Sequence, residues 1–508
     1  IIFQGSDAGS SITALTLDMS EAGAATFNSG ATFSADIVLD DNSGASPKLK
    51  FIDGNNATGH LNLNSSGKLE IATDGTVRAT ISSGGIEGLA AYNGIPFYTD
   101  TSNNSMYTHD VSGTDDSAAQ NTAYGFQALD AITTGDDNTA IGFAAGSAIT
   151  TGLYNIAIGS YAGDALVGGT KNVAIGYAAL STEDSYGKSV AIGYEALKVQ
   201  NAAADAHNVA VGHQAGKAVT TGKYNVLVGS LAGDSITEGE YNVALGYNAL
   251  AGEDAHGRNI AIGTNALANQ NAGVNAYNVA IGHNAGLTID TGSSNTLVGG
   301  LAGTNMTDAT FNTILGYSAG AAIVGGSQNT LIGALSGDAL TTGQYNVAVG
   351  IHSLGAEDTG HKAVAIGYHA LGAQNNDTDT YNVAVGYDAG KTIDTGTNNT
   401  LIGALAGDAL TTGGDNVALG RSALSTEIQG SRNVAIGFEA LKDLNTDSAS
   451  YNIAVGYHAG TNITTGLENT IIGGLAGDAL TTALGNTAVG LKALSTDTTG
   501  RYNVAIGH

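Results

Sequence analysis

The chain contains no cysteine and no tryptophan, and only two prolines, Pro47 and Pro96, in 508 residues. Without cysteine it can form neither a disulfide framework nor a thiolate metal site. Lysine and arginine are also scarce: 17 against 45 aspartates and glutamates, so the formal net charge is 17 − 45 = −28. An acidic surface of this size repels nucleic-acid phosphates and anionic lipids, so neither is an expected partner.

Long apolar runs are missing as well. None approaches the roughly 20 residues of a membrane-spanning helix, so we expect no membrane insertion. The 75 glycines follow no G-X-Y period, which excludes collagen. The hydrophobic content of 42% has a regular period, which argues against disorder. Because the chain starts at Ile1 and closes within a repeat at His508, we expect it to be a fragment of a longer protein.

One phrase dominates the rest of the chain. Residues 341–350 read TTGQYNVAVG, and close variants recur. With the asparagine of each copy numbered 0, there are 23 copies and 22 intervals, of which 18 are 17 residues long and four are 19. The copies begin at residues 121, 138, 155, 172, 189, 208, 225, 242, 259, 278, 295, 312, 329, 346, 363, 382, 399, 416, 433, 452, 469, 486 and 503. A fixed period near 20 residues is typical of a solenoid.

The residues within each copy predict a β-coil. Position +4 is Gly and position +1 is Val, Ile or Thr in all 23 copies, and position 0 is Asn except at Ser189 and Ala363. β-Branched residues at +1 and aliphatic residues at +3 predict a short strand that ends at the glycine. Seventeen residues are too few for a helix, a strand and their turns, so we predict a parallel β-solenoid. We also predict a second short strand near +11 and a hydrogen-bonded ladder of the stacked asparagines.

Position +2 suggests a partner chain. It is usually Ala, but Leu or Ile in six copies: Leu227, Leu297, Ile314, Leu331, Leu401 and Ile471. A strand that is apolar on both faces should be buried on both. We therefore predict that the +2 side chains face other copies of the chain in a symmetric homo-oligomer. The alternative is that Ala at +2 is a small exposed residue.

A longer period is superimposed on the 17-residue repeat. Position +8 alternates in pairs of Gly and pairs of Leu, and the 19-residue copies, which start at 189, 259, 363 and 433, all fall on the second Leu of a pair. Three intervals of 17 and one of 19 form a unit of 70 residues, which indicates tandem duplication. We expect the two-residue insertions to lie on related faces as small bulges.

Residues 1–119 lack the period and form a separate β-rich shaft or connector region, followed by the array over 120–508. Residues 11–30 and 68–82 alternate like short strands between Gly, Asn and Asp turns. Residues 103–120 are predicted to be a polar connection into the first coil.

The NVAIGYxAG phrase resembles the NSVAIGxxA repeats of trimeric autotransporter adhesin heads, over roughly 121–508. That resemblance implies a left-handed parallel β-roll with three chains around one axis, although the adhesin repeat is usually shorter, at about 14 to 16 residues. Long YNTAIGYxAG arrays are also similar to those of bacteriophage tail fibres. The opening IIFQGSDAGSSITALTLDMSEAGAATFN is similar to phrases in structural proteins of marine tailed phages.

Several polar residues are candidate sites. Aspartates at a repeated corner suggest calcium, but the nonapeptide calcium-roll pattern is absent, so solvated corners are expected: Asp164, Asp338, Asp408 and Asp478. His213, His283 and His508 share position +5 without metal-ligand spacing. Glu183 with Asp184, and Glu253 with Asp254, are carboxylate pairs, but the near-constant coil length leaves no cleft for hydrolysis.

Two rows of repeated residues are candidate binding surfaces. Thr341 and Thr342 exemplify a threonine row suited to ice binding, which the Leu-type coils interrupt. Tyrosines often precede the Asn and form either a receptor stripe or, as we prefer, a structural stack: Tyr154, Tyr224, Tyr241, Tyr345, Tyr381 and Tyr451.

The sequence thus predicts an all-β, homotrimeric parallel β-solenoid fibre, with no enzymatic activity, no cofactor and no catalytic, cofactor-binding or metal-binding residues. The expected function is that of a phage tail fibre, located on the virion tail outside the cell. Its expected partners are other virion tail proteins and a host-surface receptor. The alternative is a trimeric adhesin or another filament of the bacterial cell surface.

Overall fold

The computed structural model describes residues 48–52, 58–63, 69–73, 76–82, 85–87, 91–92, 95–96, 98–100, 102–108, 116–253 and 255–508. All secondary structure in this part of the chain is β, as predicted. The chain divides into two compact units, Ile1–Pro96 and Phe97–His508.

The first unit contains two small antiparallel sheets. Its five-stranded sheet has the order β1-β2-β3-β4-β5, and β6 pairs with β7. The two strands predicted within 68–82 are confirmed as β3 and β4, whereas the strands predicted within 11–30 lie outside the described residues. The bounds are β1 (Lys48–Ile52), β2 (Thr58–Leu63), β3 (Leu69–Thr73), β4 (Thr76–Ser82), β5 (Gly85–Glu87), β6 (Ala91–Tyr92) and β7 (Ile95–Pro96).

The second unit opens with a hairpin of β8 (Tyr98–Asp100) and β9 (Ser105–Tyr107). β9 then pairs in parallel with the first strand of the array, where Met106 is the partner of Thr122. The prediction of a purely polar connection over 103–120 was therefore wrong at β9. Ser105 and Tyr107 are buried, so this strand covers the edge that the first coil would otherwise expose.

Each of the 23 repeats contributes one three-residue strand, from +1 to +3. The strands are β10 (Thr122–Tyr124), β11 (Thr139–Ile141), β12 (Ile156–Ile158), β13 (Val173–Ile175), β14 (Val190–Ile192), β15 (Val209–Val211), β16 (Val226–Val228), β17 (Val243–Leu245), β18 (Ile260–Ile262), β19 (Val279–Ile281), β20 (Thr296–Val298), β21 (Thr313–Leu315), β22 (Thr330–Ile332), β23 (Val347–Val349), β24 (Val364–Ile366), β25 (Val383–Val385), β26 (Thr400–Ile402), β27 (Val417–Leu419), β28 (Val434–Ile436), β29 (Ile453–Val455), β30 (Thr470–Ile472), β31 (Thr487–Val489) and β32 (Val504–Ile506).

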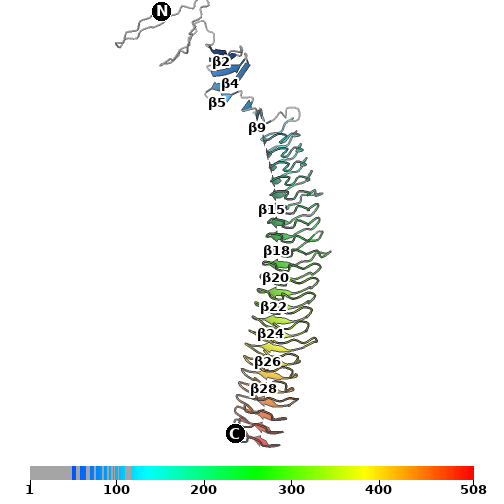
Figure 1. Ribbon diagram of the computed structural model, residues 1–508, viewed down its shortest axis with the longest axis vertical. Coiled ribbons are helices and arrows are strands. Elements are labelled where there is room, and N and C mark those ends of the chain that lie inside the picture. Colours follow the sequence, from blue (N-terminus) through cyan, green and yellow to red (C-terminus); the bar gives the residue numbers. More distant parts are fainter. Residues whose placement is uncertain are drawn as a thin grey trace, which may run out of the picture. The chain divides into compact units, whose positions relative to one another are not determined.

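These strands stack in sequence order as one parallel sheet, 24 strands long with β9 (Figure 1). Pairing is in register: Val347, Ala348 and Val349 face the residues 17 positions later, Val364, Ala365 and Ile366. The predicted parallel β-solenoid is confirmed.

The asparagine ladder is confirmed too. At Asn329 the backbone N–H donates to Asn312 Oδ1 (3.0 Å), and the side-chain amide donates to the carbonyl of Gly343 in the same coil (2.9 Å). Asn329 Oδ1 in turn accepts from the backbone N–H of Asn346 (3.0 Å). These asparagines are buried, so each satisfies backbone groups that water cannot reach.

The predicted second strand does not form. Position +11 is buried in most coils, as at Ile149 and Leu340, but it lies outside any strand. The preceding residues form turns because the backbone is left-handed at +6 and +8, for example at Leu335 (φ 55°) and Gly337 (φ 55°). Single hydrogen bonds, such as Gly337 N–H to the Ser353 carbonyl (2.9 Å), link these turns to the next coil.

The +2 side chains fill the interior of their own coil, which corrects the prediction that they face a partner. Leu331 is fully buried within the single chain. Where +2 is Leu or Ile, position +8 is always Gly; a Cβ on Gly337 would lie 2.9 Å from Leu331 Cδ2. Where +8 is Leu, as at Leu354, position +2 is always Ala, here Ala348. The two positions share one interior volume, and this sharing explains the paired rhythm.

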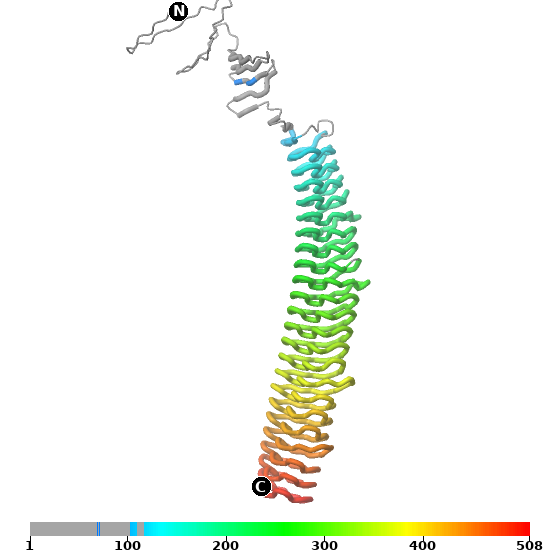
Figure 2. Tube along the Cα trace, viewed as in Figure 1, coloured from blue at the N-terminus to red at the C-terminus, as the bar shows by residue number. Residues whose placement is uncertain are grey.

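The four longer coils keep the same strand register, since Val190 still pairs with Val209. Their additional residues fall in the segment before the next Asn. Figure 2 shows the longer coils projecting on one side of the stack, as predicted for insertions on related faces.

Candidate functional site

The outer surface of the strands is the most distinctive surface of the array. In every strand from β10 to β31 the +2 residue is buried, whereas +1 and +3 point outward and are half-buried or exposed. We call the +1 and +3 side chains of all 23 coils the sheet face. It contains no charged residue, although the whole chain carries a net charge of −28.

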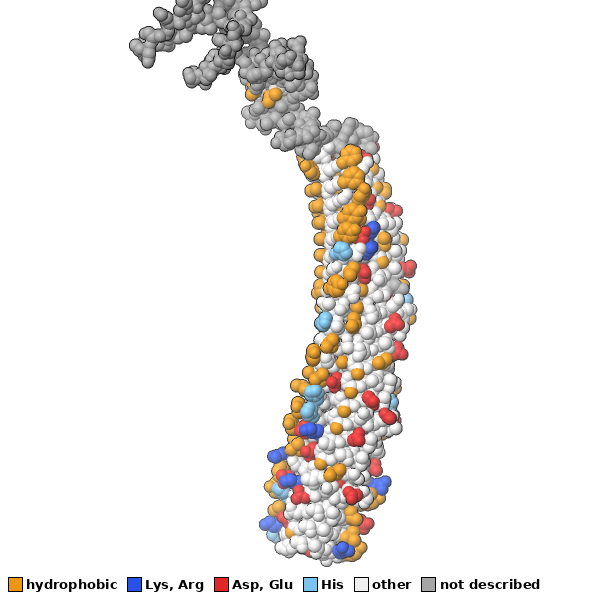
Figure 3. Space-filling view, in the orientation of Figure 1, with side chains coloured by type: hydrophobic (Ala, Val, Ile, Leu, Met, Phe, Trp, Pro, Cys, Tyr) orange, Lys and Arg blue, Asp and Glu red, His pale blue; other side chains and the backbone are white. Residues whose placement is uncertain are grey.

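Aromatic columns border the sheet face on both sides, at −1 and at +5; we call them the −1 edge and the +5 edge. From Asn121 onward the structure exposes 41 large hydrophobic side chains, and 35 of them lie at −1, +1, +3 or +5. Figure 3 shows hydrophobic side chains gathered in lengthwise rows. Apolar exposure is therefore concentrated on one side of the coil.

The first coils carry a ladder of aromatic rings. Neighbouring centroids lie 5.2–6.1 Å apart, in stacked or edge-to-face pairs. The rings belong to Phe126, Phe143, Tyr161, Tyr177, Tyr194 and His213. Because the rings contact one another along the column, this arrangement suits packing against an apolar surface better than stacking of sugar rings.

The tyrosines at −1 form a less regular column than the predicted stack. Tyr224 and Tyr241 do stack, with centroids 5.0 Å apart. Elsewhere a cation lies over the ring: Lys362 over Tyr381 at 5.1 Å, and Arg432 over Tyr451 at 5.6 Å. All these tyrosines are about half exposed, so the column is an edge rather than a sealed corner.

Sequence reasoning named Glu183 and Glu253 only as members of carboxylate pairs and missed the set of four buried glutamates to which they belong. Position +11 is occupied by a fully buried Glu in the coil before each 19-residue coil: Glu183, Glu253, Glu357 and Glu427. Glu357 accepts hydrogen bonds from the backbone N–H of Gly360 (2.6 Å) and of Asn376 (3.3 Å), and from the side chain of Gln374 (2.9 Å). Burial raises the pKa of Glu357 and of Glu183.

These glutamates have a structural role. Asn376 belongs to the inserted segment of the next coil, so the carboxylate fixes that segment to the coil below it. Glu427 binds the backbone N–H of Thr446 in the same way (3.1 Å). The signal in the sequence was a glutamate at a position that is otherwise mostly apolar, always one coil before an insertion.

The predicted carboxylate pairs do not face a common cleft. Glu183 is fully buried, whereas Asp184 is only half-buried and its carbonyl accepts from the backbone N–H of Val167 (2.7 Å). Glu253 accepts from the backbone N–H of His256 (3.2 Å), and Asp254 lies outside the described residues.

The corner aspartates lie at +9, and burial raises the pKa of Asp164, Asp338 and Asp408. They lie at least four coils apart, and the described residues contain no group of three His, Asp or Glu side chains that could hold a metal ion. His213 stacks on Tyr194 instead, at 5.2 Å. The hydroxyl of Thr341 donates to the carbonyl of Asp358 in the next coil (3.0 Å) and so links coils.

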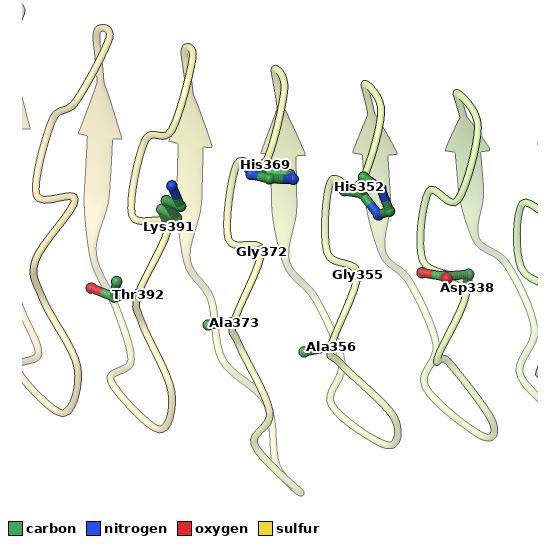
Figure 4. A pocket seen from close by; sticks show the side chains of 9 residues that line it. All are labelled: Asp338, His352, Gly355, Ala356, His369, Gly372, Ala373, Lys391 and Thr392. Carbon is green, nitrogen blue, oxygen red and sulfur yellow. The ribbon is translucent and has the colours of Figure 1, made fainter.

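A groove of about 420 Å³ crosses the turns opposite the strands, in the coils that begin at 346 and 363 (Figure 4). Only these two coils have glycine at +9, Gly355 and Gly372. A Cβ would come no closer than 3.3 Å to its neighbours at Gly355 and 3.1 Å at Gly372, and neither glycine has a positive φ. The backbone therefore does not demand glycine here, and the missing side chains open the groove.

Charged groups close the groove at both ends. Asp338 lies at one end and Lys391 at the other, and the rings of His352 and His369, 5.3 Å apart, form one wall (Figure 4). Lys391 is held by Asp388, with 3.3 Å between Nζ and Oδ2. The groove offers an acceptor and donors to a polar group of a partner molecule.

In the described part of the chain no helix could cross a membrane. Comparisons of the chain with protein-family models, with curated proteins and with solved structures each found no match.

Proposed function

We propose that the chain is a rigid, non-enzymatic fibre that assembles as a parallel homotrimer through the sheet face. The observation that carries this proposal is the uncharged, apolar sheet face, which runs the length of the array in a strongly acidic chain. Soluble monomers rarely expose contiguous apolar patches larger than a few hundred Å². An outward Val, Ile, Leu or Tyr at +3 in all 23 coils, with Val or Ile at +1 in 15 of them, far exceeds that limit.

Simple geometry favours three chains. From −1 to +5 a coil spans six residues, or at most about 20 Å at roughly 3.3 Å per residue, because only +1 to +3 form a strand. Three such faces that meet at their edges leave each backbone about 6 Å from the common axis, which matches half of the roughly 10 Å between packed sheets. Four faces would leave about 10 Å to the axis, too far for Val and Ile side chains to fill. The resemblance to trimeric adhesin heads supports the same number.

A fibre role follows from this construction. Continuous backbone pairing along 23 coils resists bending, and a shared apolar core would add to that stiffness. We propose a tail fibre of a phage, on the virion tail outside the cell, that contributes to attachment at a host-surface receptor. The similarity to phage-fibre repeats and to phage structural proteins supports this choice. A bacterial surface adhesin is the second candidate, because its head repeats are similar too.

Sedimentation velocity and native mass spectrometry test the assembly. We expect a mass near three times the 50.5 kDa of the chain and an elongated particle. A monomer at micromolar concentration would refute the fibre assembly.

Immunogold labelling tests the location. Antibodies raised against the array should label the tails of virions from the source culture. Label on bacterial surfaces in a culture free of virions would instead favour the adhesin.

A further inference from the structure

We propose that the −1 edge of one copy packs against the +5 edge of the next copy around the assembly axis, and that Asp415 and Arg421 form an ion pair across this seam. The inference rests on the proposed parallel oligomer. It goes further by naming which edges meet, in which register, and one pair of residues that joins them.

The pairing of unlike edges follows from rotational symmetry. Chains arranged around an axis parallel to the stack are related by rotation, so the −1 edge of each copy meets the +5 edge of its neighbour. Rotation does not shift the chains along the axis, so equivalent coils lie at one level. The strands pair in register along the stack, as for Val417 with Val434, which keeps both ends of a strand near the same level.

One pair of opposite charges agrees with this register, whereas the other seven charged residues of the −1 edge have an uncharged +5 residue at their level. Arg421 is the only Lys, Arg, Asp or Glu in the whole +5 column. Its guanidinium lies over the Phe438 ring, 5.4 Å from the centroid, and forms no ion pair within the described part of the chain. The −1 residue of the same coil is Asp415, whose side chain is half exposed and lies 3.6 Å from Arg432. An unpaired cation and an accessible carboxylate thus occupy opposite edges of one coil.

These two side chains cannot meet within one chain. They lie beyond opposite ends of β27 (Val417–Leu419), and in the single chain the carboxylate of Asp415 pairs with Arg432 instead. Across a seam at equal level they would be neighbours. The seam would also cover the large hydrophobic side chains of both edges, of which nine at −1 and 11 at +5 are exposed in the single chain.

Thiol cross-linking tests the seam directly, because the chain contains no cysteine. The double variant Asp415→Cys/Arg421→Cys is treated with a short bismaleimide and run on a denaturing gel. We expect most of the chain to appear as a covalent trimer. Each single variant should stay monomeric on the gel. The control pair Asp415→Cys/Ser425→Cys, with Ser425 at +9 among the turns, should also stay monomeric.

Sedimentation of the same samples separates the possible failures. A double variant that sediments as a trimer but does not cross-link overturns the seam and leaves the fibre proposal standing. A covalent dimer without trimer supports the seam and overturns the three-fold number. A wild-type chain that sediments as a monomer overturns both.

Charge reversal gives a second readout that does not depend on cysteine. Arg421→Glu places a carboxylate against Asp415 across the seam and should lower the melting temperature of the oligomer by several degrees. Asp415→Arg combined with Arg421→Asp should recover most of that loss. Equal melting of wild type and Arg421→Glu would contradict the ion pair.

Discussion

Substitutions on the sheet face test assembly most directly, because the proposed interface consists of the +1 and +3 side chains and not of the buried +2 side chains. Aspartate at Leu331 would place a charge inside the coil and unfold it, so that variant says nothing about partners. Aspartate at +3 points outward and leaves the single coil nearly undisturbed. Leu315, for example, is already 45% exposed in the single chain.

The cost to a trimer can be worked out for one layer. Complete burial of a Leu contributes about 1.5–3 kcal/mol, so covering the exposed part of Leu315 contributes about 1 kcal/mol per chain. Three carboxylates about 10 Å apart around the axis repel by about 1.7 kcal/mol per pair at an effective dielectric constant near 20, or about 5 kcal/mol in all. One layer therefore costs about 8 kcal/mol per trimer.

One such layer should lower the melting temperature without separating the chains, since 23 coils share the interface. Four successive layers cost on the order of 30 kcal/mol by the same reasoning. The test variant therefore carries aspartate at four successive +3 positions: Val298, Leu315, Ile332 and Val349. The control carries four aspartates at exposed +13 positions, off the sheet face: Thr151, Thr221, Thr291 and Thr342.

Sedimentation velocity and circular dichroism are then measured for both variants. We expect the sheet-face variant to sediment as a monomer, or as a trimer that melts far earlier, with its β spectrum retained in the monomer. The control should match wild type. The reasoning would be refuted if the sheet-face variant assembled and melted like the control.

Three further predictions concern the single coil. Asn329→Ala leaves the Gly343 carbonyl and the Asn346 N–H unpaired and should cost about 2–6 kcal/mol in denaturant unfolding. The control Asn445→Ala, at an exposed +12 position away from the sheet face and both edges, should cost under about 0.5 kcal/mol. Gly333→Ala places a Cβ 2.5 Å from the Gly350 carbonyl oxygen, on a residue with φ 134°, so the amides around it should lose their protection from hydrogen exchange. In the control Gly300→Ala the new Cβ has no neighbour closer than 3.7 Å, so protection should be retained. Because burial raises the pKa of Glu357, its contribution is greatest at acid pH and is lost as pH rises through the folded-state pKa. The free energy of unfolding of Glu357→Gln relative to wild type should therefore increase as pH rises from about 4 to about 8. A difference between the two proteins that does not change with pH would contradict the burial effect.

Local features were predictable from the sequence because the repeat displays them many times. The Gly at +4 of every copy indicated the bend, and Gly333 lies against the backbone of the next coil. The Asn at 0 indicated the ladder, and Asn329 forms it. A residue type that returns in all 23 copies, as Gly does at +4, or in 21 of them, as Asn does at 0, indicates a structural environment common to the coils.

Features that depend on two positions sharing one interior space, such as +2 and +8, could not be predicted from single positions. Considered alone, Leu331 at +2 predicted a partner chain. Its side chain instead packs inside the coil, in the space left by Gly337 at +8. The same limit hid Glu357. A carboxylate at a mostly apolar position becomes intelligible only when Gln374 and Asn376 of the next coil are seen to bind it.

A repeat that encodes its own coil so uniformly leaves little room for recognition in the consensus itself. The residues at 0, +2, +4, +7, +8 and +11 are committed to the interior of the coil, and +1 and +3 to the sheet face. In the proposed fibre, specificity for a receptor would therefore come from departures from the consensus. Two departures lie among the turns: the 19-residue coils, three of which have their inserted segment bound by a buried glutamate of the coil before, and the Gly355–Gly372 groove between Asp338 and Lys391. Gly355 and Gly372 have no positive φ, and the longer coils keep the same strand register, so neither departure is required by the stacking of the strands. In a fibre whose sheet face is turned inward, both would lie outside the shared core, where a host surface could reach them.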